Sequence, residues 1–129
     1  MMVFFARRRR IGQQGERHAR RFLRRRGWRI VTKNLRIGKD EVDILAVSPK
    51  GETLAMVEVR STADSQGDPR RTVGHKKRRC MTRSARQVLF LARKHRCQLR
   101  VDLIEVNLGH QPPTIVHHEG VLPINNEIK

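Results

Sequence analysis

Two acidic residues, Asp43 and Glu58, lie inside runs of sequence that are otherwise typical of β-strands. The runs 41–47 and 53–60 are rich in β-branched and apolar residues, and the Pro and Gly between them predict a β-hairpin. With the turn at Lys50-Gly51, the hairpin register places Asp43 directly opposite Glu58 on one face. Two carboxylates directly opposite each other on paired strands repel each other unless a cation lies between them. A bound divalent metal ion would supply that cation.

The same register places Glu41 opposite Arg60, so that four charged residues share one face of the hairpin. One alternative is that this face is simply solvated, since acidic residues are common on outer faces. Leu45 and Met56 argue against that alternative, because their positions put them on the same face as the carboxylates. The opposite face is apolar too, which predicts a hairpin covered on both sides, where carboxylates need partners. A second register stays open, because a bulge at Pro49 would shift the pairing by one residue.

Composition indicates one domain that binds polyanions. The chain of 129 residues holds 29 Lys and Arg against 12 Asp and Glu, with a formal net charge of +17 and a pI near 11.7. That length suits one hydrophobic core, and that charge favours nucleic acid as the partner. Four Phe, one Trp and no Tyr offer little aromatic surface for stacking single-stranded bases. Contacts to the backbone of duplex or branched DNA are therefore expected.

Other features of the sequence exclude some roles. We find no apolar run of about 18 residues, and the apolar residues 1–6 precede the basic run 7–10, the reverse of a secretory signal. We therefore expect a cytoplasmic protein that does not bind membranes. Cys80 and Cys97 lack metal-ligand spacing and are expected to be plain thiols. His117-His118 is expected to be structural, because adjacent residues on a strand point to opposite faces.

The order of predicted elements is a helix, three strands, a helix, and then one or two strands, which is an α/β fold around a central mixed sheet. The domain is expected to span 11–119, with a basic N-terminal extension over 1–10 and a tail over 120–129 that has too few apolar residues to promise order. The expected elements are a helix over 11–26, strands over 28–35, 41–47 and 53–60, a loop over 61–69, a helix over 73–96, and strands over 99–108 and 114–118.

Both predicted helices carry charged residues that bear on function. The second helix is amphipathic and basic, and it lacks nearby acids that would make neutralising i, i+4 pairs, so that phosphate contact explains its charge better than solvation alone. In the first helix, Glu16 has two open interpretations, an ion pair with Arg20 at i+4 or a role in the site. The residues expected to contact nucleic acid are Arg36, Lys76, Lys77, Arg79 and Arg83.

Several short motifs occur together in an order that is more specific than any one of them. They are Gly15-Glu16, Ala19, Phe22-Leu23, Gly27-Trp28, Asn34, Arg36, Glu41 to Ala46, and Val57 to Arg60. Over residues 11–106 the chain thereby resembles the YraN-like family. That largely uncharacterised family is similar to the archaeal Holliday-junction resolvases, and the resemblance implies a restriction-endonuclease-like fold whose site holds an Asp and then Glu-x-Lys on the next strand.

The resemblance also implies a site chemistry. Asp43 matches the family's metal-binding aspartate and Glu58 its glutamate, while Glu41 and Glu16 match the acids of the first motif and of the helix. The expected cofactor is Mg²⁺ or Mn²⁺, because hard carboxylate oxygens suit these ions, which lower the pKa of a bound water. The expected activity is structure-selective cleavage of DNA in repair or recombination, with Arg60 completing the catalytic residues.

Two positions depart from the family pattern. Asp40 stands where the family usually has Gly, and Arg60 stands where it has the catalytic Lys. A guanidinium group can stabilise a charged transition state but cannot transfer a proton. The alternative function is therefore a catalytically inactive nucleic-acid-binding module that keeps the fold. Junction-cleaving relatives act as dimers, and by that analogy Val121-Leu122 is the apolar pair expected at a homodimer interface.

Overall fold

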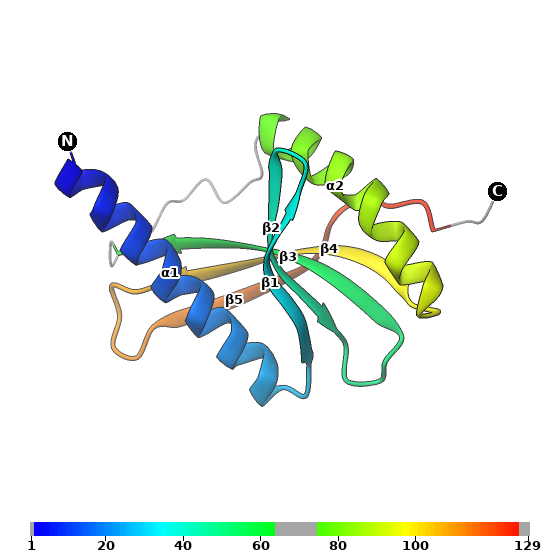
Figure 1. Ribbon diagram of the computed structural model, residues 1–129. Coiled ribbons are helices and arrows are strands. Elements are labelled where there is room, and N and C mark those ends of the chain that lie inside the picture. Colours follow the sequence, from blue (N-terminus) through cyan, green and yellow to red (C-terminus); the bar gives the residue numbers. More distant parts are fainter. Residues whose placement is uncertain (1, 64–74, 127–129) are drawn as a thin grey trace.

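The computed structural model describes residues 2–63 and 75–126, with side chains described over 9–63 and 79–126. A five-stranded sheet lies between two helices, one on each face (Figure 1). The elements in chain order are α1 Met2–Arg25, β1 Arg29–Ile37, β2 Asp40–Val47, β3 Thr53–Thr62, α2 His75–Lys94, β4 Gln98–Asn107 and β5 Thr114–Leu122. The predicted order of elements is confirmed, and it is the order expected of a restriction-endonuclease-like fold.

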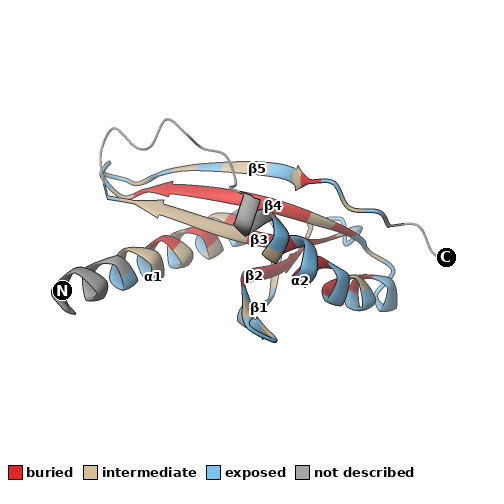
Figure 2. Cartoon of the chain, turned by 90° about the horizontal axis from the view of Figure 1, so that it is seen from above, coloured by how far each residue is buried: buried red, intermediate tan, exposed pale blue. Residues whose placement is uncertain are grey.

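The sheet is mixed, as predicted. Its strands follow the order β1-β2-β3-β4-β5, in which β3 and β4 run parallel and the other neighbours run antiparallel. A parallel pair needs a crossover connection, and α2 supplies it between β3 and β4. Figure 2 shows that β4, between β3 and β5, is buried over most of its length.

Two hydrophobic cores, one under each helix, explain why the central strands are apolar on both faces. The core under α1 consists of Ala19, Leu23, Trp28, Ile44, Ala46, Ala55, Val57, Ile104 and Val106. The core under α2 consists of Val42, Leu45, Val47, Leu54, Met56, Met81, Ala85, Val88, Ala92, Leu99, Val101 and Leu122. The predicted coverage of the hairpin on both sides is thus confirmed.

Both ends of the domain differ from the prediction. Helix α1 begins at Met2 and not at Ile11, because arginine is a good helix former and neither Gly nor Pro occurs before Gly12. Strand β5 continues to Leu122, which is buried, with Val121 packed beside it in the core under α2. These two apolar residues therefore pack at least in part within the chain, and the homodimer interface stays a prediction.

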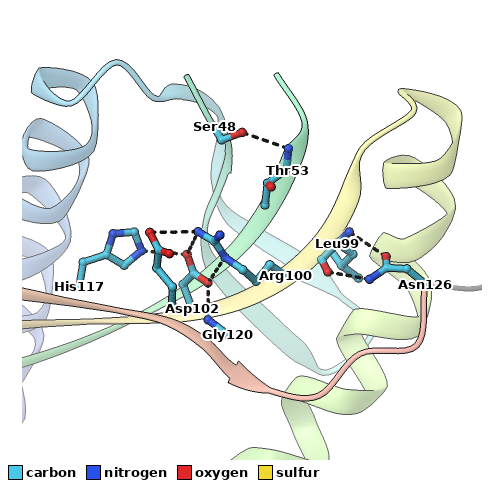
Figure 3. Close-up of polar contacts among 9 residues, drawn as sticks. Ser48, Thr53, Leu99, Arg100, Asp102, His117, Gly120 and Asn126 are labelled. Atoms are coloured by element: carbon cyan, nitrogen blue, oxygen red, sulfur yellow. Dashed lines mark hydrogen bonds and ion pairs between the residues drawn. The ribbon is translucent and has the colours of Figure 1, made fainter. Parts of the chain in front are cut away.

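The segment after β5 is also attached to the sheet. The side-chain amide of Asn126 donates to the carbonyl oxygen of Leu99 at 3.1 Å and accepts from its N–H at 2.8 Å (Figure 3). Part of the segment that was expected to lack order is thus held by backbone hydrogen bonds of β4. Most of the predicted loop over 61–69 and the last residues, 127–129, lie outside the described residues.

Candidate functional site

The β2–β3 hairpin has the predicted register. Ile44 pairs with Val57 and Val47 with Leu54, so that no shift occurs at Pro49. The turn is closed by Ser48, whose hydroxyl accepts from the N–H of Thr53 at 3.0 Å (Figure 3). The positive φ of 76° at Gly51 suits glycine, which has no Cβ to clash in that conformation.

Backbone pairing between the two strands ends just before the acidic residues. The last pair is Ile44 with Val57, so Asp43 and Glu58 come next in register without being joined by the ladder. Instead, the carboxylate of Asp43 accepts from the N–H of Val59 at 2.9 Å. This contact fixes one oxygen of Asp43 at the point where the two strands separate.

Strand alternation reverses at Asp43. Ile44 packs in the core under α1, whereas Val42, two residues earlier, packs in the core under α2. On β1, Lys33 pairs with Ile44 and Leu35 pairs with Val42, and Asn34 lies between these two pairs. Its φ of 52° is left-handed, a conformation that Asn tolerates better than most residues. The prediction of uniform alternation is therefore wrong at this point, and with it the prediction that Glu41 and Asp43 share one face of the hairpin with Glu58 and Arg60. Glu41 and Asp43 face the α1 side.

Helix α1 approaches β3 very closely at Gly15. A Cβ atom on Gly15 would lie 1.6 Å from the hydroxyl oxygen of Ser61, so only glycine fits. That hydroxyl is buried and has no hydrogen-bond partner among the described residues, which shows how tightly the backbone of α1 covers it. The Gly15-Glu16 motif thus acts as a unit, because the close contact carries Glu16 to the edge of the hairpin.

The carboxyl groups at this edge repel one another. Burial raises the pKa of Glu16, and the charge of Asp43 and a hydrogen bond shared with its carboxyl raise it further, to about 7, with Glu41 adding to the effect. Arg20 opposes this shift more weakly than the acids promote it. The site role predicted as one interpretation of Glu16 therefore describes its surroundings better than the ion pair with Arg20.

Asn34 joins two of these acids. In the orientation that lets its amide nitrogen donate, this nitrogen lies 3.0 Å from Oε1 of Glu41 and 3.3 Å from Oε1 of Glu16. Asn34 belongs to the family motifs, but no function was predicted for it. Its signal was its residue type within a strand, because Asn is depleted in strands and accepts left-handed backbone angles.

Two cavities meet the carboxylates from opposite sides, and Glu41, Asp43 and Glu58 line both. The cavity beside α1 has a volume of about 530 Å³ and is also lined by Arg9, Gly12, Gln13, Glu16, Asn34 and Val59. The cavity beside α2 has a volume of about 320 Å³ and is also lined by Lys39, Asp40, Val42, Met56, Val57, Cys80, Met81 and Ser84.

The donor set suits a hard divalent cation, although it is not yet arranged around one point. Within the described ranges, no three acids, histidines or cysteines stand in an arrangement that holds a metal ion. The hydrogen bond between Glu16 and Asp43 requires a proton, and a cation that replaced this proton would let both groups ionise. Glu16, Glu41 and Asp43 could hold that cation after side-chain rotation, with Glu58 on the neighbouring strand.

Arg60 lies beyond the carboxylates on β3. It follows Glu58 on the same side of the strand and pairs in register with Glu105 of β4. The described residues that line the two cavities do not include Arg60. Arg36 is exposed on β1 and pairs with Glu41, at the outer edge of the site. Their predicted roles in catalysis and DNA contact stay predictions.

The basic helix α2 is neutralised at one of its predicted contact residues. Arg83 binds Asp40 of β2 through two hydrogen bonds, of 2.6 and 2.7 Å. These bonds lower the pKa of Asp40. The prediction concerned i, i+4 partners within the helix, and the acid that neutralises Arg83 comes instead from a strand. Arg79 is exposed on α2, whereas the side chains of Lys76 and Lys77 lie outside the described part.

A second acidic centre was missed in the sequence analysis. Asp102 of β4 is fully buried and binds Arg100 at 2.8 and 3.0 Å, His117 at 2.8 Å and the N–H of Gly120 at 3.0 Å (Figure 3). Burial alone would raise the pKa of Asp102, but these hydrogen bonds together lower it. The sequence signal was the pair Arg100 and Asp102, two residues apart and hence on one face of the strand.

The two adjacent histidines of β5 contribute to different faces of the sheet, as predicted. The ring of His117 packs edge-to-face against Trp28, with centroids 5.8 Å apart, in addition to binding Asp102. His118 lies on the other face, where its Nε2 is 3.7 Å from a carboxylate oxygen of Glu105. Each histidine thus contacts an acid of β4, on opposite faces of the sheet.

Comparison with other proteins identifies the family. Residues 15–106 match the model of the uncharacterised protein family UPF0102. A UPF0102 protein of Carboxydothermus hydrogenoformans is 34% identical over 116 residues, which are 89% of this chain and 97% of that protein. Another, from Chlorobium phaeobacteroides, is 35% identical over 97 residues, covering 74% of this chain and 75% of the relative.

Structural comparison finds a distant likeness. The structure of Pyrococcus furiosus SfsA in complex with Ca²⁺ matches with a TM-score of 0.32 and 12% identity, over 82% of this chain and 60% of that one. At that distance the fold assignment rests on the topology of the sheet itself. No helix among the described residues is long and apolar enough to span a membrane. The chain belongs to the uncharacterised family UPF0102, as its resemblance to the YraN-like proteins predicted.

Proposed function

We propose that this protein is a divalent-metal-dependent endonuclease that hydrolyses phosphodiester bonds in duplex or branched DNA. The observation that carries the proposal is the convergence of Glu16, Glu41 and Asp43, since burial and these neighbouring acids together raise the pKa of Glu16 to about 7. Folding brings these acids together against their mutual repulsion. Such an arrangement is typical of sites that bind cations or perform chemistry.

The residues of the chain would divide the work as follows. Glu16, Glu41, Asp43 and Glu58 would hold Mg²⁺ or Mn²⁺, which supplies a Lewis acid and an activated water when bound. The N–H of Val59 keeps one oxygen of Asp43 in place. Arg60 would stabilise the charge that develops on the phosphate, and it would leave proton transfer to another group. The net charge of +17 would draw DNA to the site.

A catalytically inactive nucleic-acid-binding module is the second candidate. It is favoured by Arg60 at the position where the resemblance implies a lysine, and by the lack of a ready-made metal arrangement within the described ranges. Such a module would keep the basic surface and the fold while losing turnover. The two candidates therefore agree on DNA binding and differ on cleavage.

The deciding experiment is a cleavage assay on labelled duplex, flap and four-way junction DNA, with and without Mg²⁺ or Mn²⁺. Asp43→Ala is the control variant, because it removes one carboxylate at the centre of the cluster. We expect cleavage to need the metal and to fall by at least about 10²-fold in Asp43→Ala, more than the loss of a supporting residue would cause. DNA affinity should stay the same or rise, since a negative charge is removed. Undiminished cleavage by Asp43→Ala would place the activity elsewhere.

Arg60 separates the two candidates further. In an active enzyme, Arg60→Lys should keep or raise cleavage, because an ammonium is compact and can approach a metal-bound water, whereas Arg60→Ala should abolish it. In a binding module, both variants should retain DNA affinity and neither should cut. The same DNA substrates and metal concentrations serve both variants, so that only the side chain differs.

A further inference from the structure

A groove runs along the flank of α1 that faces away from the carboxylates. It consists of two adjoining hollows, of about 540 Å³ and about 260 Å³, that share His18 and Pro113. One wall is α1, and the other is formed by the connection between β4 and β5 with the start of β5. Phe22 and Ile115, both partly buried, give the groove an apolar floor.

The helix wall of the groove carries a row of arginines. Arg17, Arg21 and Arg25 are spaced by four residues, which aligns them along one face of α1 about 6 Å apart. All three are exposed, and none forms an ion pair within the described part of the chain. The residues that line the groove include no acid.

Like charges at this spacing weaken a helix. Each i, i+4 pair of equal charge costs roughly 0.2–0.5 kcal/mol in an isolated helix. The row of arginines therefore does not by itself stabilise the folded chain. Arg83 of α2 differs, because Asp40 neutralises it. An apolar floor lowers the local dielectric constant and strengthens the attraction of the row for an external anion.

The surroundings of the row favour a polyanion in solution over a lipid surface. Helices that lie on membranes insert an apolar face. The apolar face of α1 is already packed on the sheet through Ala19 and Leu23, and the exposed described positions of the helix are Arg and Gln. A chain of phosphates in solution fits this surface better.

We infer that the groove and the row Arg17, Arg21 and Arg25 bind the phosphate backbone of a nucleic acid, at a place separate from the carboxylates. For the identity of the polyanion, the inference rests on the proposed function. Glu16 lies on the other flank of α1, so a DNA molecule that contacts both must cross this helix, which is about 10–12 Å wide. The groove would thus orient the substrate, and its loss should raise KM with little effect on kcat.

The test is DNA binding by the double variant Arg21→Gln/Arg25→Gln, followed by fluorescence anisotropy over a range of NaCl concentrations. The matched control is Lys33→Gln/Lys50→Gln, which removes the same charge from exposed positions of β1 and of the β2–β3 turn. The slope of log K against log salt should become less steep by about 1.8 in the groove variant, from about 0.9 per phosphate contact, and should not change in the control.

Each other outcome has a defined meaning. Equal losses in both variants would show a diffuse effect of charge and would overturn the groove. Normal binding by the groove variant, with a wild type that binds DNA, would also overturn it while leaving the proposed function intact. A wild type without salt-dependent DNA binding would instead reject DNA as the ligand of the proposed function. Loss of binding to anionic phosphatidylserine vesicles alone would identify a lipid occupant and contradict the inference.

Discussion

Two aspartates on the α1 side of the sheet have opposite electrostatic surroundings. Asp102 is fully buried and receives hydrogen bonds from Arg100 and His117, which keep its pKa below the usual value. Asp43 receives one backbone N–H and lies against Glu16, whose pKa is raised to about 7. The first aspartate is compensated by positive groups within the fold, whereas the second lies against another acid.

Under the proposed function, this difference in compensation separates a structural acid from a functional one more clearly than burial does. A compensated carboxylate stabilises the fold that contains it, and removing it leaves its partners without an anion. An uncompensated cluster of acids destabilises the fold, and such clusters concentrate at sites of binding and catalysis. Substitutions in the two regions should therefore change stability in opposite directions.

The largest effect is expected for Asp102→Ala. This change leaves the partly buried guanidinium of Arg100 and the ring of His117 without their acceptor, which should lower the free energy of unfolding by about 3 kcal/mol, the lower end of the range for a broken buried pair. Urea denaturation measures this loss. Asp43→Ala, as the matched variant, should leave stability unchanged or raised. A similar loss in both variants would erase the distinction between the two aspartates.

Gly15→Ala should have the next largest effect, because its Cβ would lie 1.6 Å from the hydroxyl oxygen of Ser61. The displaced helix should destabilise the protein by roughly 1–3 kcal/mol and should move Glu16 away from Asp43, so that the pKa of Glu16 falls toward its ordinary value.

The control for this prediction is Gly12→Ala, where an added Cβ meets nothing within 4 Å. In that position, alanine should stabilise α1 by up to about 1 kcal/mol. Ser61→Gly should relieve the clash and restore stability to the Gly15→Ala variant. Failure of this rescue would show that the close contact does not position α1.

A smaller and pH-dependent effect is expected for Glu16→Gln. The pKa of Glu16 is raised from 4.5 to about 7, so its protonated form stabilises the wild type fully below pH 4.5, and this stabilisation is lost as the pH rises through 7. The variant keeps a neutral hydrogen-bonding group and should be more stable than the wild type above pH 7, by on the order of 1 kcal/mol after allowance for partial exposure.

Thermal unfolding at pH 5 and pH 8 tests whether the variant gains stability relative to the wild type as the pH rises. The two values lie on either side of the pKa of Glu16, which is about 7. Added Mg²⁺ should stabilise the wild type more at the higher pH, because metal binding requires the ionised carboxylate. The variant should respond less. Identical responses of both proteins to Mg²⁺ would remove Glu16 from the metal site.

The smallest effect concerns Asp40, a half-buried carboxylate that is compensated by Arg83. Asp40→Asn should release Arg83 for contact with DNA and make the slope of log K against log salt steeper by about 0.9. Salt titrations of DNA binding measure this change. An unchanged slope would mean that Arg83 does not reach the DNA even when free.

The order of elements and the hairpin register could be predicted from the sequence because each rests on local signals. Alternating apolar residues marked the strands, and Lys50-Gly51 marked the turn. The acids Glu41 and Asp43 were found by the same pattern, together with the family resemblance. These signals depend only on neighbouring residues, which is why the predicted order of elements and hairpin register agree with the folded protein.

What the sequence did not predict depends on contacts between distant segments or on a single backbone angle. The left-handed backbone of Asn34 accompanies a reversal, at Asp43, of the alternation of side chains between the two faces of the sheet. A rule of uniform period 2 cannot predict such a reversal. Asp102 and His117 lie on different strands, so that their contact follows from the sheet order. The same holds for Arg83, whose partner belongs to β2.

The contact between Asn126 and Leu99 sets the boundary of the folding unit. A chain that stopped after the last residue of β5 would contain all five strands and would still leave both backbone groups of Leu99 without their present partners. Buried backbone groups in that state are costly. The shortest gene fragment that encodes the complete sheet with its hydrogen bonds therefore extends through the codon for Asn126, beyond the last strand.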